Sequence, residues 1–264
     1  MSHLLTQDPK IRHAIRVIKE QYGQDVSVDA KDKDLSKFGR NTAIDTNPAT
    51  VMTLPSGVYQ ESYVSDNLIV QYSSSKAADS TTVLTIEGHT ISGNDLTFVT
   101  QTTALNGQSS TALGTPLARA TRAYVSTGTE DLEGNIYFAE GCNVASGVPD
   151  TNSYVHMIIP SGLNQTEKAS TSLSSTDYWL ISSIHVSIYE KTAGFADVLL
   201  ETRKIGSVFL QKERLAVNTG GGFTQIFFDP YIIIPPNTDV RLTAVGDAAT
   251  AVGAGIEGYL AKVV

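Results

Sequence analysis

The segment from Phe223 to Ala244, FTQIFFDPYIIIPPNTDVRLTA, constrains the fold of this chain more than any other. Two apolar runs lead into Pro235-Pro236-Asn237-Thr238, and an alternating apolar and polar segment follows. β-branched and aromatic residues pack well on a pleated sheet, whereas Pro and Asn favour a turn. The segment therefore predicts a hairpin of strand, turn and strand, with its turn at an exposed end. Its expected core residues are Phe227, Ile232 and Ile234.

Similar short β segments recur throughout the chain after residue 41. Turn sequences such as Ser92-Gly93-Asn94-Asp95 and Asn106-Gly107 separate them, because Asn and Gly accept the positive φ of hairpin turns. Short strands at this spacing indicate antiparallel sandwiches. The expected strands are 50–54, 67–72, 83–87, 96–103, 119–126 and 135–139, followed by 154–159, 178–189, 198–208, 223–228, 232–234, 239–244 and 255–262.

The expected fold class is all-β, with two antiparallel β-sandwich regions preceded by an amphipathic helix and an extended arm. The second region has the strand number of a jelly roll. A chain of 264 residues is long enough for one large or two ordinary domains. We assign 1–40 to the helix and arm, 41–145 to the first sandwich and 146–264 to the second, with a hinge at 141–150.

One helix is predicted at the N-terminal end of the chain. Asp8 suits its N-cap, Pro9 its first turn and Gly23 its C-terminal stop. A helix of about 14 residues is marginal in isolation, so its apolar face needs a partner, which is either its own body or a neighbouring subunit. The charged segment 24–40 is interpreted as an extended tether with Phe38 as an anchor. The apolar face of the helix comprises Ile11, Ala14, Ile15, Ile18 and Tyr22.

The net charge of −8 is unevenly distributed. Residues 1–40 carry eight basic and six acidic residues, a net charge of +2, whereas the remainder carries eleven basic and twenty-one acidic residues, a net charge of −10. An acidic body argues against a nucleic-acid partner, whose phosphates demand a basic face. No secretion signal opens the sequence, and no apolar run approaches the roughly 20 residues of a membrane helix. We therefore expect synthesis in a cytoplasm and no membrane partner.

Residue types and spacings give no catalytic or metal signature. Cys142 is the single cysteine, so neither an intrachain disulfide nor a cysteine metal cluster can form. There is no G-x-S-x-G motif, and His156 and His185 lie in expected strands, where a lone histidine is usually structural. Asp239 and Arg241 share one strand face, where they can pair with a neighbouring strand, and such pairing is more often structural than catalytic. We expect no enzyme activity, no metal and no cofactor.

Several short segments resemble structural proteins of tailed bacteriophages, notably those of marine and cyanobacterial hosts. The segment 37–41, KFGRN, is similar to the one that follows the arm in that group, and 119–125, RATRAYV, to the end of its first β region. Gly221-Gly222-Phe223 and the segment 234–241, IPPNTDVR, resemble its last hairpin. The resemblance covers most of residues 37–264 and implies a virion structural component.

The resemblance favours a capsid decoration or cement protein that binds the outside of a phage head and bridges capsomers through its arm. The implied partners are the major capsid protein and further copies of the chain, as a trimer or dimer, and the implied location is the virion, after synthesis in the host cytoplasm. The expected arm contacts are Ile11, Ile15, Ile18, Tyr22 and Phe38.

Two other roles remain open. A receptor- or glycan-binding module of a tail or head fibre would use loop or surface aromatics to stack on sugar rings. The candidate residues for glycan contact are Tyr178, Trp179 and Tyr189, although Trp179, which precedes an apolar strand, is also a core candidate. A head-tail junction component is the other alternative.

Overall fold

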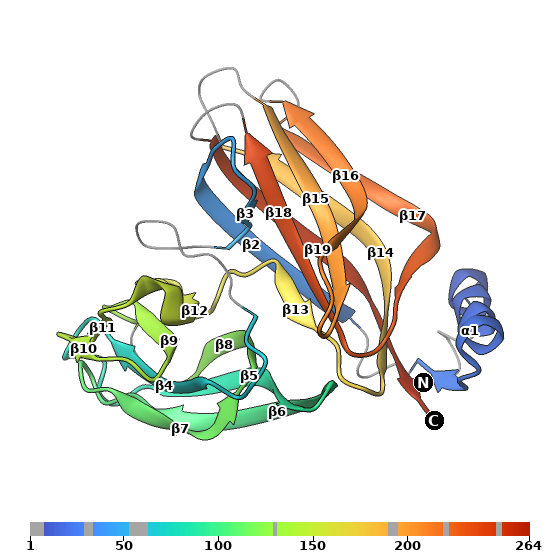
Figure 1. Cartoon of the computed structure of the whole chain (residues 1–264). Coiled ribbons are helices and arrows are strands. Elements are labelled where there is room, and N and C mark those ends of the chain that lie inside the picture. The colour runs from blue at the N-terminus through green and yellow to red at the C-terminus, as the bar shows by residue number, and fades with distance from the viewer. Residues whose placement is uncertain are drawn as a thin grey trace.

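The computed structural model describes residues 8–28, 34–52, 63–128, 131–189, 195–218, 222–246 and 250–264. Within these residues, an N-terminal helix is followed by two β-sandwiches that lie against each other, with the helix against the C-terminal one (Figure 1). The prediction of an all-β fold preceded by a helix is confirmed.

Helix α1 (Pro9–Tyr22) begins and ends where the sequence predicts. The Asp8 carboxylate accepts the backbone N–H of Lys10 at 2.7 Å, and Gly23 closes the helix at φ +67°. A left-handed residue at this position is easy for glycine, which has no Cβ. The helix ends are therefore determined by residues next to them in the sequence.

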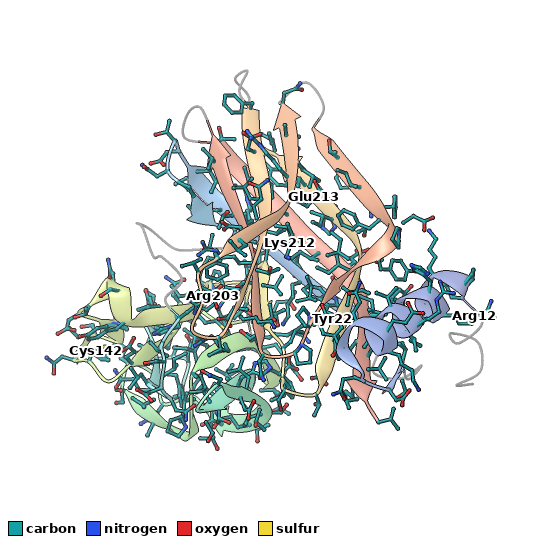
Figure 2. The ribbon with its side chains drawn as sticks, turned by 45° about the vertical axis from the view of Figure 1, so that its right-hand side comes forward. Arg12, Tyr22, Cys142, Arg203, Lys212 and Glu213 are labelled. Carbon is teal, nitrogen blue, oxygen red and sulfur yellow. The ribbon has the colours of Figure 1, made fainter. Side chains whose placement is uncertain are left out.

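The apolar face of α1 is covered by the chain's own body. Ile11, Ala14 and Ile18 are buried, and they share a hydrophobic cluster with side chains of the C-terminal sandwich. Tyr22 adds an edge-to-face contact with Tyr178, with ring centroids 5.6 Å apart, whereas Arg12 projects from the side of the helix away from the sandwich (Figure 2). Of the two expected partners, the body of the same chain is the one observed. The sandwich residues in this cluster include Tyr178, Leu180 and Ala261.

The N-terminal sandwich consists of a four-stranded sheet, β12-β9-β4-β7, and a three-stranded sheet, β6-β5-β8. Its core lies between them and includes Tyr72, Leu84 and Phe138. A hairpin of β10 (Val144–Ala145) and β11 (Val148–Pro149) lies at the end remote from the C-terminal sandwich (Figure 1). The strands are β4 (Ile69–Ser74), β5 (Val83–Ser92), β6 (Asp95–Ala104), β7 (Thr111–Leu117), β8 (Arg119–Thr127), β9 (Ile136–Glu140) and β12 (Val155–Ile159), the last preceded by the 3-10 turn η2 (Asn152–Tyr154).

The C-terminal sandwich packs the sheet β1-β19-β14-β17, with β2 also paired to β19, against the sheet β13-β18-β15-β16, with β3 also paired to β18. Trp179 is completely buried in its core. The strands are β1 (Val26–Ser27), β2 (Asp34–Ile44), β3 (Ala49–Thr50), β13 (Ser170–Ser172), β14 (Asp177–Ile188), β15 (Phe195–Lys204), β16 (Leu210–Asn218), β17 (Phe223–Ile234), β18 (Thr238–Gly246) and β19 (Thr250–Val263).

The tether predicted over 24–40 is wrong for β1 and β2, which are paired with β19. The sequence of β2 does not predict a strand, because one face carries Leu35, Lys37 and Gly39 rather than a series of apolar residues. Lys37 faces the other sandwich, and a Cβ at Gly39 would collide with the backbone of Val51. Close approach and an interface, rather than hydrophobicity, specify this strand.

The predicted hairpin over 223–244 is also corrected. β17 pairs with β14, whereas β18 pairs with β13, β15 and β3, so the segment crosses from one sheet to the other. Ile234 is buried and Ile232 packs against the core as expected, but Phe227 is 73% exposed. The inward positions beside it belong to Ile226 and Phe228, because successive strand residues face opposite sides.

Strand pairing divides the chain differently from the sandwich boundaries predicted from the sequence, which were 41–145 and 146–264. β3 belongs to the C-terminal sandwich, and β12 pairs with β9 in the N-terminal one. The segment 141–150, expected to be a hinge, contains the β10–β11 hairpin. The chain therefore begins the C-terminal sandwich with β1 to β3, builds the N-terminal one from β4 to β12, and returns. Hydrogen bonds between distant segments decide this division, and composition does not reveal them.

Candidate functional site

Of the residues predicted to contact a capsid or subunit, some are buried in the structure and others are exposed. Ile11 and Ile18 are 0% exposed and Ile15 packs against the same cluster, so the prediction that these three contact a partner is wrong for this fold. Tyr22 and Phe38 keep about two fifths of their surface exposed, at 40% and 41%. Phe38 lies on β2 rather than on a tether.

The residues predicted to contact a glycan also include both buried and exposed side chains. Trp179 is in the core of the C-terminal sandwich and Tyr178 lies under α1, so neither ring can stack on a sugar. The core interpretation of Trp179 is confirmed. Tyr189, which follows β14, is 58% exposed and is available at the surface.

Tyr189 belongs to a group of aromatic side chains on the outer face of β2, β19, β14 and β17. We call Phe38, His185, Tyr189 and Phe223 the aromatic face. Three separate parts of the chain contribute to it, and strand register aligns them. One row across the four strands is Arg40, Gly253, Ser187 and Phe223, and the next is Phe38, Gly255, His185 and Gln225.

Glycines in β19 give the aromatic face its shape. A Cβ at Gly255 would come within 2.4 Å of the His185 ring, and a Cβ at Gly253 within 2.9 Å of the Tyr189 ring. The rings therefore lie across the glycine backbone. His185 stacks beside Phe223 at 6.3 Å between centroids, and together with Tyr189 they line a depression of about 480 Å³.

Charged and polar groups border this depression. The Arg40 guanidinium lies 5.0 Å from the centre of the Tyr189 ring, a cation–π distance. Ser187 donates a hydrogen bond to the Tyr189 hydroxyl at 2.9 Å. Pockets with aromatic walls and a few oriented polar groups are typical of binding sites. The arrangement is suited to holding a partner or a ligand.

A buried ion pair joins the two sandwiches. The Arg119 guanidinium of β8 donates to both oxygens of Asp239 on β18, from Nε at 2.8 Å and from a terminal nitrogen at 3.2 Å. The same carboxylate accepts from Ser172 at 2.6 Å and from Arg203 at 3.0 Å. Asp239 is 0% exposed and Arg119 5%. Two of these four charge-assisted hydrogen bonds, those from Arg119, cross from one sandwich to the other and hold the two in one orientation.

Two aromatic rings cover this ion pair. Tyr63 lies 5.2 Å from the Arg119 guanidinium and 4.4 Å from that of Arg203. Phe209 packs edge-on against Tyr63 at 5.0 Å and lies 3.8 Å from the guanidinium of Arg241. Arginine stacks favourably on aromatic faces and its planar group binds carboxylates in a fork. Asp239 and Arg241 pair with a neighbouring strand as predicted: Asp239 accepts from Arg203 at 3.0 Å and Arg241 donates to Glu201 at 2.9 Å, both partners lying on β15.

Two further titratable groups are buried between the sandwiches. Lys37 is 7% exposed, and desolvation by burial lowers its pKa to about 8, against the opposing influence of Glu87. Burial lowers the pKa of His89 to about 3, with Lys37 acting in the same direction. The His89 ring meets Phe98 edge-on at 5.4 Å, and its Nδ1 has no hydrogen-bond partner among the described residues. Both groups line a cavity of about 360 Å³.

In the part of the chain that the structure describes, no three His, Cys, Asp or Glu side chains gather as a metal site, and no helix is long and apolar enough to cross a membrane. His156 pairs with Glu140 at 2.9 Å, with His156 almost fully buried. This contact is a structural hydrogen bond within one sheet, since the two residues lie on adjacent strands.

Sequence reasoning missed Arg40, His185, Phe223 and Lys37 as site residues. The signal for the first three is the glycine alternation Gly253-Ala254-Gly255, which marks a strand that other side chains cross. Lys37 carries no such signal, because its burial arises from the packing of one sandwich on the other.

No family model matches this chain, and no curated protein matches it. A solved structure of infectious bursal disease virus, Gt strain, is 11% identical over 88% of this chain and 72% of that chain, with a TM-score of 0.22. The tandem CBM22 domains of Xyn10C from Paenibacillus barcinonensis are 13% identical over 86% of this chain and 93% of that chain, with a TM-score of 0.23. Similarities this low carry no functional inference.

Proposed function

We propose that the chain is a non-enzymatic structural protein of a virus particle, a decoration or cement protein that docks on the major capsid protein through its aromatic face. The observation that carries the proposal is the group of exposed large apolar side chains on one sheet face: Phe38 at 41%, Tyr189 and Phe223 at 58% each, and Phe227 at 73%. A clustered apolar surface of this kind marks an interaction site. The resemblance of the segments 37–41 and 234–241 to phage structural proteins supports the particle as its location.

Docking through this face suits a cement role energetically. Full burial of one large apolar side chain contributes about 1.5–3 kcal/mol, and the same contact repeated over a shell adds up. The buried pair of Arg119 and Asp239 joins the sandwiches, so force applied to one is passed to the other. Association into dimers or trimers is part of the same proposal.

The docking element proposed here differs from the arm expected from the sequence. Helix α1 packs on its own sandwich, and residues 34–40 are part of β2. Deleting residues 1–40 would therefore remove most of an integral strand, and loss of capsid binding by that truncation would not identify an arm. Point substitutions on the aromatic face are the informative test.

The paired substitutions Phe38→Ser and Phe223→Ser are expected to weaken binding to undecorated capsid shells at least tenfold, because two exposed rings lose their contacts. Co-sedimentation with purified shells measures this. Leu210→Ser is the matched control, since Leu210 is 60% exposed on the opposite sheet. Unchanged binding of the double variant would exclude this face as the docking surface.

A copy number in the purified particle far below that of the major capsid protein would instead indicate a position in the tail or at its junction.

Oligosaccharide binding is the second candidate, favoured by the depression of about 480 Å³ between aromatic rings and the polar groups Arg40, His185 and Ser187. Aromatic faces pack against the apolar faces of sugar rings while polar neighbours orient the hydroxyls. Tyr189→Ala is then expected to reduce affinity for a bound member of an oligosaccharide panel at least tenfold, measured by calorimetry. Leu210→Ser again serves as control. Absence of binding across the panel would leave only the docking role for this face.

A further inference from the structure

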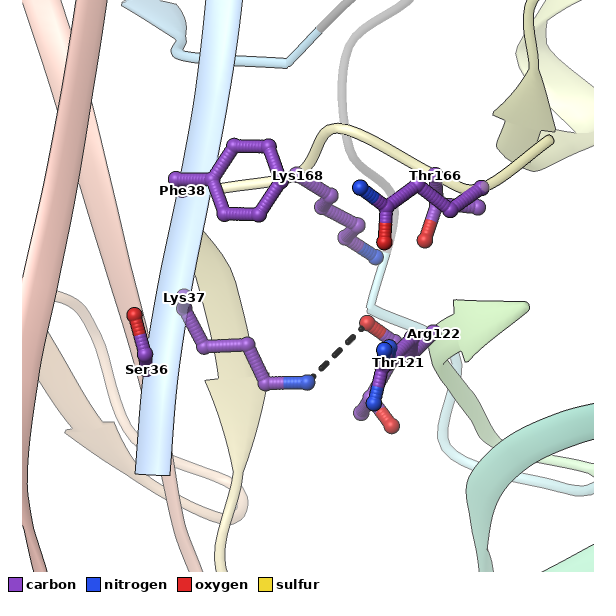
Figure 3. A pocket seen from close by; sticks show the side chains of 8 residues that line it. Ser36, Lys37, Phe38, Thr121, Arg122, Thr166 and Lys168 are labelled. Carbon is purple, nitrogen blue, oxygen red and sulfur yellow. Dashed lines mark hydrogen bonds between the residues drawn. The ribbon is translucent and has the colours of Figure 1, made fainter. Parts of the chain in front are cut away.

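A second cavity lies between the two sandwiches, and Phe38 lines both this cavity and the depression on the aromatic face. The volume of the cavity is about 240 Å³, and residues of β2, of β8 and of the segment 165–168 line it (Figure 3). Among the described residues that line it, the charged side chains are Lys37, Arg122 and Lys168, and none is a carboxylate. In a chain of net charge −8, three cations around one cavity are a marked local reversal of charge.

The two lysines of this cavity are buried more completely than lysines usually are. Lys37 is 7% exposed and Lys168 6%. Figure 3 shows the Lys37 side chain running from β2 toward the backbone of β8, where its Nζ donates to the Thr121 carbonyl at 3.4 Å. Lys168 donates to the carbonyls of Ala120 at 2.8 Å and His156 at 3.4 Å. Lysine is rarely buried so fully unless a partner neutralises it.

Lys37 is the group whose surroundings leave it least satisfied. An ammonium has three donor hydrogens, and within the described residues Lys37 has one acceptor, at a long 3.4 Å. It forms no ion pair there, and its pKa is lowered by burial, which reflects the cost of keeping the charge. Glu87 on β5 raises the pKa of Lys37, but its ion-pair partner is Arg122, at 3.9 Å. An anionic partner would stabilise a buried ammonium that has so few acceptors.

We propose that this cavity binds a tetrahedral oxyanion, phosphate or sulfate, between the ammonium of Lys37 and the guanidinium of Arg122. The lining hydroxyls of Thr166 and Ser36 are additional donors suited to its oxygens. A fork of guanidinium donors matches such an anion, and an ammonium adds a point charge. Because Lys37 belongs to one sandwich and Arg122 to the other, the anion would also link them. This inference does not depend on the proposed docking role.

The test uses the full chain with inorganic phosphate and sulfate, each compared with chloride at equal ionic strength. We expect saturable binding of the two oxyanions by isothermal calorimetry and a rise in melting temperature that chloride does not produce, since a ligand that binds only the folded state stabilises it. Lys37→Met is expected to weaken binding at least tenfold. Arg122→Gln, at a partly exposed position that does not threaten folding, is expected to weaken it several-fold.

Lys212→Met is the matched control, because it removes the same charge from an exposed position on β16 (Figure 2). It should bind oxyanions as the unchanged chain does, which separates a local site from general attraction. An acetate arm distinguishes a tetrahedral anion from any carboxylate, and we expect weaker binding of acetate. The proposal is overturned if phosphate and sulfate act no differently from chloride, or if Lys37→Met and Arg122→Gln both bind them as tightly as the unchanged chain.

Discussion

Replacing Asp239 by alanine is expected to lower the free energy of unfolding by about 3–5 kcal/mol, the cost of removing one partner of a buried ion pair. The carboxylate is 0% exposed and accepts hydrogen bonds from Arg119, Arg203 and Ser172. Without it, the Arg119 guanidinium stays buried with no counter-charge from Asp239, although its bonds to the carbonyls of Val64 and Ala118 remain. Urea denaturation at neutral pH measures the loss.

The same substitution should also uncouple the two sandwiches. Arg119 and Asp239 lie on different sandwiches, so we expect calorimetry of Asp239→Ala to resolve two thermal transitions where the unchanged chain shows one. Asp25→Ala is the control, because the pair of Lys19 and Asp25 is short, at 2.6 Å, but both side chains are more than 60% exposed. Exposed pairs contribute about 0–1 kcal/mol. A loss for Asp239→Ala no larger than that of the control would contradict the interface role.

Replacing His89 by phenylalanine is expected to remove a large part of the acid sensitivity of the fold. The pKa of His89 is about 3 in the folded chain, against an ordinary value of 6.5, because burial disfavours its charged form. Between these two pH values the unfolded chain therefore binds the proton that the folded chain does not. Stability from this group is fully present above pH 6.5 and falls as the pH falls toward 3. The loss at the acid end is on the order of 3–5 kcal/mol.

Denaturation midpoints measured from pH 7 to pH 3 check this expectation. The difference in stability between the unchanged chain and His89→Phe should shift by that amount in favour of the variant as the pH falls, while the contributions of buried carboxylates cancel between them. Phenylalanine can keep the edge-to-face contact with Phe98. His13→Gln on α1 is the control, because it removes an imidazole outside the interface between the sandwiches. Parallel profiles for the unchanged chain and His89→Phe would contradict the expectation, because they would show that the pKa of His89 is the same in the folded and unfolded states.

The resemblance to phage structural proteins and the aromatic face both support the docking role that we propose. The resemblance rests on short motifs, of which 37–41 and 234–241 both lie in the C-terminal sandwich. The first of these contains Phe38 and Arg40, which are part of or border the aromatic face. The segment 37–41, on which part of the resemblance rests, therefore also contributes to the surface proposed for docking.

The sequence alone determined the features that depend on residues close to one another in the chain. Asp8, Pro9 and Gly23 predict the ends of α1 because a cap bonds to the backbone of its own first or last turn. Alternation in the segments 178–189 and 239–244 predicts β14 and β18 because side-chain direction follows the backbone with period two. The burial of Trp179 follows from its position in such a segment.

The tertiary structure decided the features that depend on pairing between distant residues. β17 and β18 are consecutive in the sequence yet join opposite sheets, and β2 becomes a strand only through its register with β19. Arg119 meets Asp239 across 120 residues of chain, and the aromatic face aligns Phe38, His185 and Phe223 over two glycines of β19. Local propensity carries no information about register between distant strands. For that reason the helix and many of the strands could be predicted from the sequence, and the surfaces proposed for binding could not.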